Sequence, residues 1–124
     1  MVRILVADDD HAILDSTQLL LECEGYEVIT ASSGDAVCDL ENNLPDVILL
    51  DIWLSGTNGA EVARFLKAQE RTRHIPIILF SANRHIEHLA KEAGVEDTLT
   101  KPFDIETLLQ KIQKYTPFSV RGRD

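Results

Sequence analysis

Apolar runs alternate along this chain with segments in which apolar residues recur every three to four positions. The runs predict five strands, over residues 2–7, 27–31, 46–50, 75–80 and 97–100. Three of them are almost continuously apolar, which is typical of strands buried on both faces of a sheet. The last run, DTLT, is short and polar and therefore predicts an edge strand.

The intervening segments have helical periodicity. They predict helices over residues 11–24, 33–42, 59–70, 84–93 and 104–115. Residues that favour helix starts and ends frame these segments: Asp10, Ser32 or Ser33, and Asp104 as N-caps, and Gly25 and Gly94 after the last turn.

Five strands that alternate with five helices predict an α/β fold, a single doubly wound five-stranded parallel sheet with helices on both faces. We assign residues 1–116 to this domain. Residues 117–124 have no periodicity, so we expect them to form a tail or the start of a linker.

Composition narrows the function classes. The 124 residues carry a formal net charge of −9, which argues against direct nucleic-acid binding but suits a site for a cation. No apolar run approaches the ~20 residues of a membrane helix, and the start, MVRIL, does not read as a signal peptide. We therefore expect a cytoplasmic protein whose Cys23 and Cys38 are reduced, core or half-buried thiols; a disulfide is the less favoured alternative.

Polar side chains follow four of the predicted strands. Asp8 and Asp9 come after the first strand, Asp51 after the third, Ser81 after the fourth and Lys101 after the fifth. The carboxyl ends of parallel strands open onto one edge of the sheet, where ligands bind. Clustered carboxylates repel one another unless a cation lies between them, and oxygen ligands with open positions suit Mg²⁺.

Four segments, ILVADDD, PDVILLDIWLSGTNG, IPIILFSA and TLTKPF, give the chain a recognisable pattern. In their order and spacing they resemble the receiver domain of two-component response regulators, over residues 2 to about 116. The resemblance implies a flavodoxin-like strand order 2-1-3-4-5, for which a member of this family is a standard example.

The resemblance also implies roles for the strand-end residues. Asp51 matches the phosphoacceptor, which takes a phosphoryl group from a histidine kinase or a histidine phosphotransfer domain and later loses it by hydrolysis. Mg²⁺ is then expected on Asp9, Asp51 and the backbone carbonyl of Trp53, with Asp8 acting through water. Such a protein acts chemically only on its own phosphoryl group, and no external-substrate enzyme is expected.

Further expectations concern the rest of this edge and the protein's partners. Lys101 should pair with one phosphoryl oxygen and Ser81 with another, and the Lys101–Pro102 bond should be cis as in the family. The kinase or phosphotransfer domain is expected to dock on the first helix and the loop before the last helix, at Ile13, Leu14, Thr17, Pro102 and Phe103. Glu96, Asp97 and Lys111 resemble, loosely, charges at a dimer face, which makes a homodimer through the fourth helix, fifth strand and fifth helix a candidate.

The chain departs from the family in the switch region and in the loop after Asp51. Thr98 stands where receivers usually carry Tyr or Phe, so signalling through the last two helices is expected to differ. Ser55 stands where they usually carry Pro. Trp53 and Asn83 border the site, and we expect Trp53 to shield the acyl phosphate from water.

Two other function classes fit parts of the sequence. Asp8-x-Asp10 resembles the nucleophile motif of haloacid-dehalogenase-type phosphohydrolases, with Asp8 as nucleophile, although Ala12 departs from that motif. A phosphorylation-independent interaction module with a receiver fold is the other alternative. The histidines, His11, His74, His85 and His88, are expected to be exposed or boundary residues rather than metal ligands.

Overall fold

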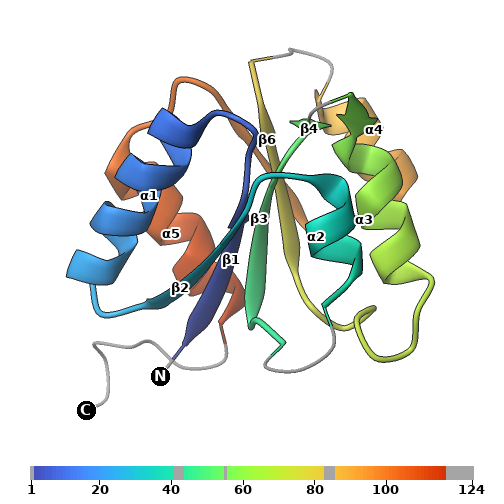
Figure 1. Cartoon of the computed structure of the whole chain (residues 1–124), viewed down its shortest axis with the longest axis horizontal. Coiled ribbons are helices and arrows are strands. Elements are labelled where there is room, and N and C mark those ends of the chain that lie inside the picture. The colour runs from blue at the N-terminus through green and yellow to red at the C-terminus, as the bar shows by residue number, and fades with distance from the viewer. Residues whose placement is uncertain (1, 41–43, 55, 83–85, 117–124) are drawn as a thin grey trace.

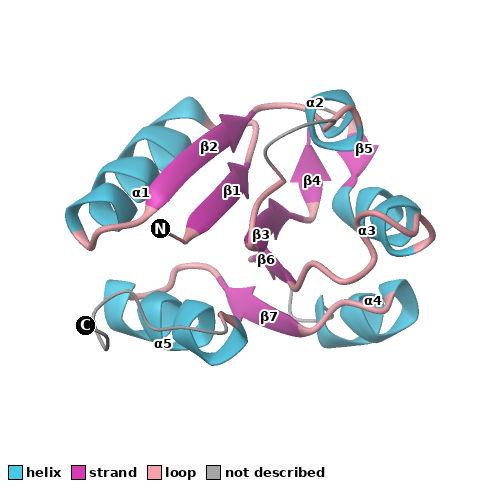
Figure 2. Cartoon of the chain, turned by 90° about the horizontal axis from the view of Figure 1, so that it is seen from below, coloured by secondary structure: helices cyan, strands magenta, loops and turns pink. Residues whose placement is uncertain are grey.

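The computed structural model describes residues 2–40, 44–54, 56–82 and 86–116. A five-stranded parallel sheet forms its centre, in the order β2-β1-β3-β6-β7 (Figures 1 and 2). Because β6 and β7 are the fourth and fifth strands of this sheet along the chain, the predicted order is confirmed. The strands are β1 (Arg3–Ala7), β2 (Glu27–Ala31), β3 (Val47–Asp51), β6 (Ile77–Ser81) and β7 (Asp97–Thr100).

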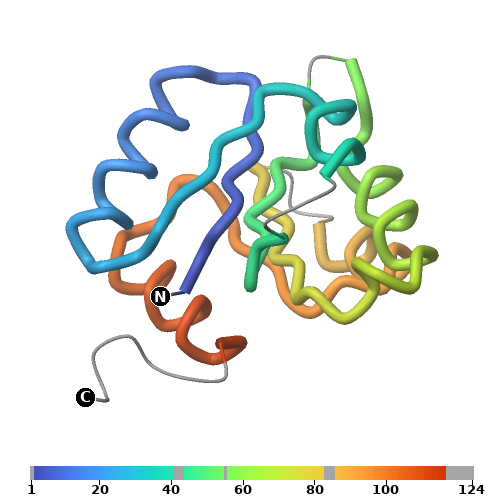
Figure 3. Tube along the Cα trace, turned by 60° about the horizontal axis from the view of Figure 1, so that its bottom comes forward, coloured from blue at the N-terminus to red at the C-terminus, as the bar shows by residue number. Residues whose placement is uncertain are grey.

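Five helices cover the sheet in two layers. On one face lie α1 (His11–Cys23) and α5 (Ile105–Tyr115). The other face carries α2 (Gly34–Cys38), α3 (Gly59–Lys67) and α4 (Ile86–Ala93). Figure 3 follows the crossovers: the chain leaves β1, returns as β2 on its outer side, and then crosses to β3 on the other side.

The core explains why the central strands are almost continuously apolar. Along β1, Ile4 and Val6 pack under α1 and α5, whereas Leu5 and Ala7 pack under α2, α3 and α4. Every one of these residues is at most 1% exposed. A strand with helices on both faces buries every position, so the alternation of apolar and polar residues disappears.

Local signals place the helix ends. The Asp10 carboxylate accepts hydrogen bonds from the amides of Ala12 and Ile13 at 3.0 and 3.3 Å, and Ser33 and Asp104 cap α2 and α5 in the same way. Gly25 and Gly94 adopt positive φ after α1 and α4, a conformation that costs glycine little. The predicted caps are confirmed.

Two predicted helices are shorter in the structure. The helix expected over 33–42 is the five-residue α2, whose last turn tightens where the Leu40 amide reaches back to the Val37 carbonyl at 3.4 Å. The helix expected over 59–70 ends at Lys67. The ammonium group of Lys67 donates to the carbonyls of Arg73 and Ile75, and these contacts turn the chain back toward β6.

Two further features differ from the prediction or add to it. The segment after Asp51 forms a small antiparallel hairpin of β4 (Trp53–Leu54) and β5 (Thr57–Asn58), with Gly56 at φ +85°. Cys23 is exposed rather than core or half-buried; it and the partly buried Cys38 are both free thiols. No helix within the described residues is long and apolar enough to cross a membrane.

Candidate functional site

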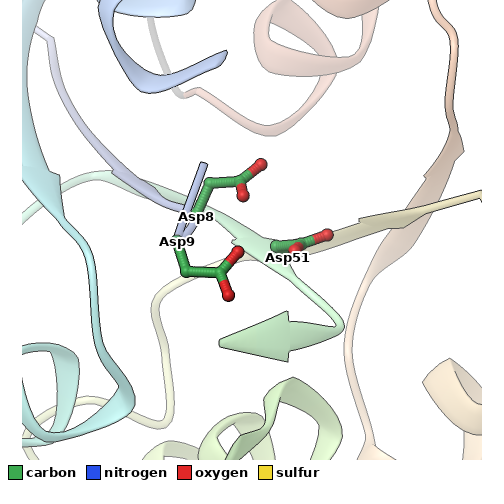
Figure 4. A group of neighbouring side chains, drawn as sticks. All are labelled: Asp8, Asp9 and Asp51. Atoms are coloured by element: carbon green, nitrogen blue, oxygen red, sulfur yellow. The ribbon is translucent and has the colours of Figure 1, made fainter. Parts of the chain in front are cut away.

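Three carboxylates meet at the carboxyl edge of the sheet. Asp8 and Asp9 follow β1, and Asp51 is the last residue of the neighbouring strand β3. Each offers a carboxylate oxygen, and these oxygens lie within 4.8 Å of one another (Figure 4). Asp8 and Asp51 are buried and Asp9 is half-buried. Within the described residues, this is the one group of His, Cys, Asp and Glu side chains with the spacing of a metal site.

Lys101 brings one positive charge into this group. Its ammonium nitrogen Nζ lies 2.9 Å from Asp8 Oδ2 and 3.2 Å from Asp51 Oδ1. The same nitrogen sits 4.8 Å from the centre of the Phe80 ring, a cation–π contact. The Lys101 amide donates to the Ser81 carbonyl at 2.9 Å, and the Lys101–Pro102 bond is cis, as expected.

Burial and neighbouring charges at this edge shift the pKa values of Asp51 and Lys101. Burial, and then the negative charge of Asp8, raise the pKa of Asp51 to about 6, although Lys101 opposes the shift. Burial alone lowers the pKa of Lys101, but the hydrogen bond to Asp8 and the charge of Asp51 outweigh it and hold that pKa above its ordinary value. Lys101 therefore stays an ammonium ion, in contact with two of the three carboxylates.

This donor set fits a magnesium ion. Carboxylate oxygens are the ligands that Mg²⁺ prefers, and it binds through one or two of them while keeping several waters. The pKa of Asp51 is raised first by burial and then by the negative charge of Asp8, and a divalent cation between the carboxylates relieves the second of these effects. Asp8, Asp9 and Asp51 therefore have the chemistry and the spacing to hold the ion.

Two more residues of the predicted site lie around this group. Ser81 is buried at the end of β6, the strand that pairs with β3 next to Asp51. Trp53 lies on β4, two residues after Asp51, with its side chain 56% exposed. The carboxylate of Asp10 caps α1 and is not a member of the acidic group, which weakens the phosphohydrolase alternative.

The histidines that the structure describes, His11, His74 and His88, are not members of this group. His88 pairs with Glu92 at 3.3 Å on the exposed side of α4, and His11 and His74 are exposed, as expected. His85 lies outside the described residues, and so do Ser55 and Asn83, two of the departures from the family pattern.

Sequence reasoning missed one residue that touches the site. Gly59, the first residue of α3, donates its amide to the carbonyl of Ile52 at 2.6 Å, directly after Asp51. The signal available was the Asn58–Gly59 pair at a helix start. That pair predicts a cap, but it does not predict which backbone the helix start contacts.

Comparison with known proteins agrees with this geometry. The profile of the response regulator receiver domain matches residues 4–113. The transcriptional regulator RpaA of Synechocystis sp. is 39% identical over 116 residues, covering 91% of this chain and 48% of its own length. The response regulator PleD of Caulobacter vibrioides is 40% identical over 121 residues, covering 95% of this chain and 27% of its own length.

A solved structure gives the same picture. The response regulator TrrA of Thermotoga maritima, in complex with Mg²⁺ and BeF, has a TM-score of 0.82 and 32% identity, covering 93% of this chain and 99% of that one. The chain thus spans about half or less of the two curated relatives, but nearly the whole of this receiver structure. The chain belongs to the receiver domains of two-component response regulators, whose role is phosphorylation-based signalling.

Proposed function

We propose that Asp51 accepts a phosphoryl group from a phosphohistidine of a sensor kinase or a histidine phosphotransfer domain. One observation carries the proposal: Asp51 ends a central strand with Asp8 and Asp9 within ligand distance and Lys101 in an ion pair with it. A carboxylate nucleophile of this kind forms an acyl phosphate by ordinary covalent catalysis.

The transfer is a displacement at phosphorus. An oxygen of Asp51 forms a bond to phosphorus while the bond between phosphorus and the histidine nitrogen breaks. The electron pair of the broken bond stays on the imidazole, which takes up a proton. The transition state is loose and spreads charge over the equatorial oxygens. Lys101 pairs with one of them, and the Ser81 hydroxyl donates to another.

The metal in this proposal is Mg²⁺. Asp9, Asp51 and the Trp53 carbonyl would hold the ion directly and Asp8 through water. The ion supplies neutralisation of phosphoryl charge. The protein's own residues position the site: β1 and β3 fix the carboxylates, and Lys101 holds Asp8 and Asp51 in ion pairs at 2.9 and 3.2 Å.

A groove beside the site supports the predicted docking of the phosphodonor. It has a volume of about 410 Å³ and runs between α1 and the loop before α5, where Ile13, Thr17, Leu20, Pro102 and Phe103 line it. Exposed Leu20 adds apolar surface there, and an exposed apolar patch is typical of a docking face. Leu14, included in the predicted surface, is 4% exposed and packs in the core instead.

Self-association through α4, β7 and α5 stays a prediction. Asp97 pairs with Lys111 at 3.0 Å and Glu96 with Lys67 at 2.7 Å within the same chain. A dimer on this face would have to exchange at least the Asp97–Lys111 pair for its equivalent across two copies. We propose no nucleic-acid contact by this domain.

Thr98 sets the expected mode of switching. Its amide donates to Asp97 Oδ1 at 2.8 Å, and its side chain is half-buried at the edge of the sheet. We propose that this receiver switches without an inward-swinging aromatic ring. A structure with a phosphoryl mimic in which Thr98 and Ser81 stay in place would support this, and a large move of both would count against it.

We infer further that residues 1–116 form the domain and that 117–124, which lie outside the described residues, are a tail or the start of a linker. A phosphodonor kinase of this class implies a cytoplasmic location. The output is a partner or a further domain of a longer protein, because the curated relatives extend well beyond the matched region.

The test is incubation with acetyl phosphate and Mg²⁺ followed by intact mass spectrometry. A Mg²⁺-dependent gain of one phosphoryl group is expected in the wild type and in Asp46→Asn, an exposed acid at the opposite edge of the sheet. Asp51→Asn should show no gain. A wild type that stays unmodified even with its cognate kinase would favour the phosphorylation-independent interaction module.

A further inference from the structure

The start of α3 lies against the backbone that carries Asp51. Gly59 is buried, and its amide donates to the Ile52 carbonyl at 2.6 Å. This satisfies one of the amides that every helix start leaves without a partner inside the helix. Ile52 also contacts β6, because its own amide donates to the Phe80 carbonyl at 3.0 Å. Ile52 is therefore held from both sides, by β6 and by α3.

The contact with α3 leaves no room for a side chain. A Cβ atom on residue 59 would overlap the carbonyl oxygen of Asp51 and lie 2.9 Å from the Cα of Ile52. Both neighbours are backbone atoms, one at the buried end of β3 and one in the half-buried residue that follows it, so neither can rotate away as a side chain can. Gly59 is not among the glycines with positive φ, so its backbone conformation is open to any residue. Close approach, not conformation, requires glycine here.

We propose that Gly59 is a positioning residue for the acceptor site, an inference that rests on the proposed function. The missing side chain lets α3 close onto the Asp51–Ile52 peptide. That closure sets where the Asp51 carboxylate and the Trp53 carbonyl stand relative to Asp8 and Asp9. A side chain at residue 59 displaces the peptide, and with it two of the proposed metal ligands.

The test is the Mg²⁺ affinity of Gly59→Ala, measured by calorimetry and by the fluorescence of Trp53, the single tryptophan of the chain. Disturbing the groups that orient metal ligands typically costs 10- to 100-fold in affinity, so we expect the Mg²⁺ dissociation constant to rise about tenfold or more. Phosphorylation by acetyl phosphate at low Mg²⁺ should slow accordingly.

Two other glycines supply matched controls. Gly94→Ala strains a residue at φ +77° with open space around it, so it lowers stability without touching the site. Gly34→Ala meets only side-chain atoms, the Cγ2 of exposed Thr57 at 2.9 Å, which can move away, and the Cγ2 of buried Val62 at 3.1 Å. Both should bind Mg²⁺ within about twofold of the wild type, a margin that corresponds to ~0.4 kcal/mol.

A second measurement covers a Gly59→Ala chain that does not fold. In the wild type, hydrogen exchange should protect the Gly59 amide to the same degree as the amides of β3. An unchanged Mg²⁺ affinity in folded Gly59→Ala, or exchange of the Gly59 amide as fast as that of an exposed loop, would overturn the proposal. A wild type that binds Mg²⁺ but takes no phosphoryl group would remove only the acceptor role of Asp51, whereas one that binds no Mg²⁺ would overturn both.

Discussion

Asp51 is the last residue of β3 and Asp97 is the first residue of β7, so they lie at opposite ends of the strands of one parallel sheet. Their pKa values are shifted in opposite directions. Burial and the charge of Asp8 raise the pKa of Asp51 to about 6. Burial also pushes the pKa of Asp97 upward, but hydrogen bonds from Lys111, the Thr98 amide and Tyr115 outweigh it and hold that pKa below its ordinary value. The ionised form of an aspartate side chain is thus destabilised at Asp51 and stabilised at Asp97.

The difference distinguishes a candidate functional site, around Asp51, from a cluster that stabilises the fold, around Asp97. Around Asp97 the donors match the acceptors: Lys111 Nζ lies at 3.0 Å and the Tyr115 hydroxyl at 3.1 Å. Around Asp51, in the part of the chain that the structure describes, three carboxylates lie close together and the Lys101 ammonium group contacts two of them. A matched cluster stabilises the fold and needs nothing further, whereas a surplus of negative charge is what attracts a metal ion. The two clusters can be compared directly by substitution.

The largest effect is expected for Lys101→Met. This change leaves Asp8, 1% exposed, and Asp51 without their cation. Breaking a buried ion pair costs about 3–5 kcal/mol, so the free energy of unfolding at pH 7 in EDTA should fall by about 3 kcal/mol, as measured by urea denaturation. Lys91→Met on the exposed side of α4 is the control, expected within ~0.5 kcal/mol of the wild type. A loss below ~1 kcal/mol for Lys101→Met would mean that the carboxylates do not depend on this ion pair.

Asp51→Asn should raise stability. A carboxyl with a raised native pKa keeps its proton in the folded state up to about pH 6, while the unfolded chain loses it near pH 4. Ionised Asp51 therefore destabilises the metal-free fold above about pH 6. After allowance for solvent screening, the gain on substitution should be ~1–2 kcal/mol at pH 7 and should vanish as pH falls toward 4. Urea denaturation across this range measures it, and a gain that persists at pH 4 would contradict the charge explanation.

Asp97→Asn should lower stability, with the opposite pH dependence. Because the native pKa of Asp97 is depressed, its contribution is complete above the unfolded pKa near 4 and is lost as pH falls through the native value. We expect a loss of ~1 kcal/mol at pH 7 that shrinks below pH 4. The same urea series reports it, and a loss independent of pH would show that packing, not charge, links Asp97 to α5.

The smallest effect is expected for Trp53→Ala. The indole borders the site but is more than half exposed, so it can shield an acyl phosphate only in part. Removing it should speed hydrolysis about threefold, equivalent to ~0.7 kcal/mol in the barrier. The decay of the phosphorylated mass at fixed Mg²⁺ measures this rate. Decay at the wild-type rate would remove Trp53 as a shield.

The strands were predictable because burial on both faces leaves an unbroken apolar run, as in β3 and β6. The hairpin of β4 and β5 was not, because two-residue strands are too short to show alternation. The shortening of α3 was missed for a different reason: Lys67 ends this helix through contacts with Arg73, Ile75 and, across the fold, Glu96. Such contacts form only after folding and leave no local pattern in the sequence.

The candidate site divides in the same way. Asp8, Asp9 and Asp51 could be placed together from the sequence because the topology of a parallel sheet dictates which strand ends meet. The ion pair of Lys101 with Asp8 at 2.9 Å and the closure of Gly59 onto the Asp51 backbone could not. Both depend on the ångström-scale position of a loop or helix relative to the sheet, and spacing along the chain does not determine that position.

The ion pair between Asp8 and Lys101 joins residues 93 positions apart. In the unfolded chain, nothing distinguishes Asp51 from the other acidic residues, which number 21 in all. It faces an ammonium group and two further carboxylates only when β1, β3 and β7 lie in one sheet. Under the proposed function, a truncated or misfolded copy cannot be loaded with a phosphoryl group. Phosphorylation of Asp51 is thus restricted to correctly folded molecules, and only these can carry the signal.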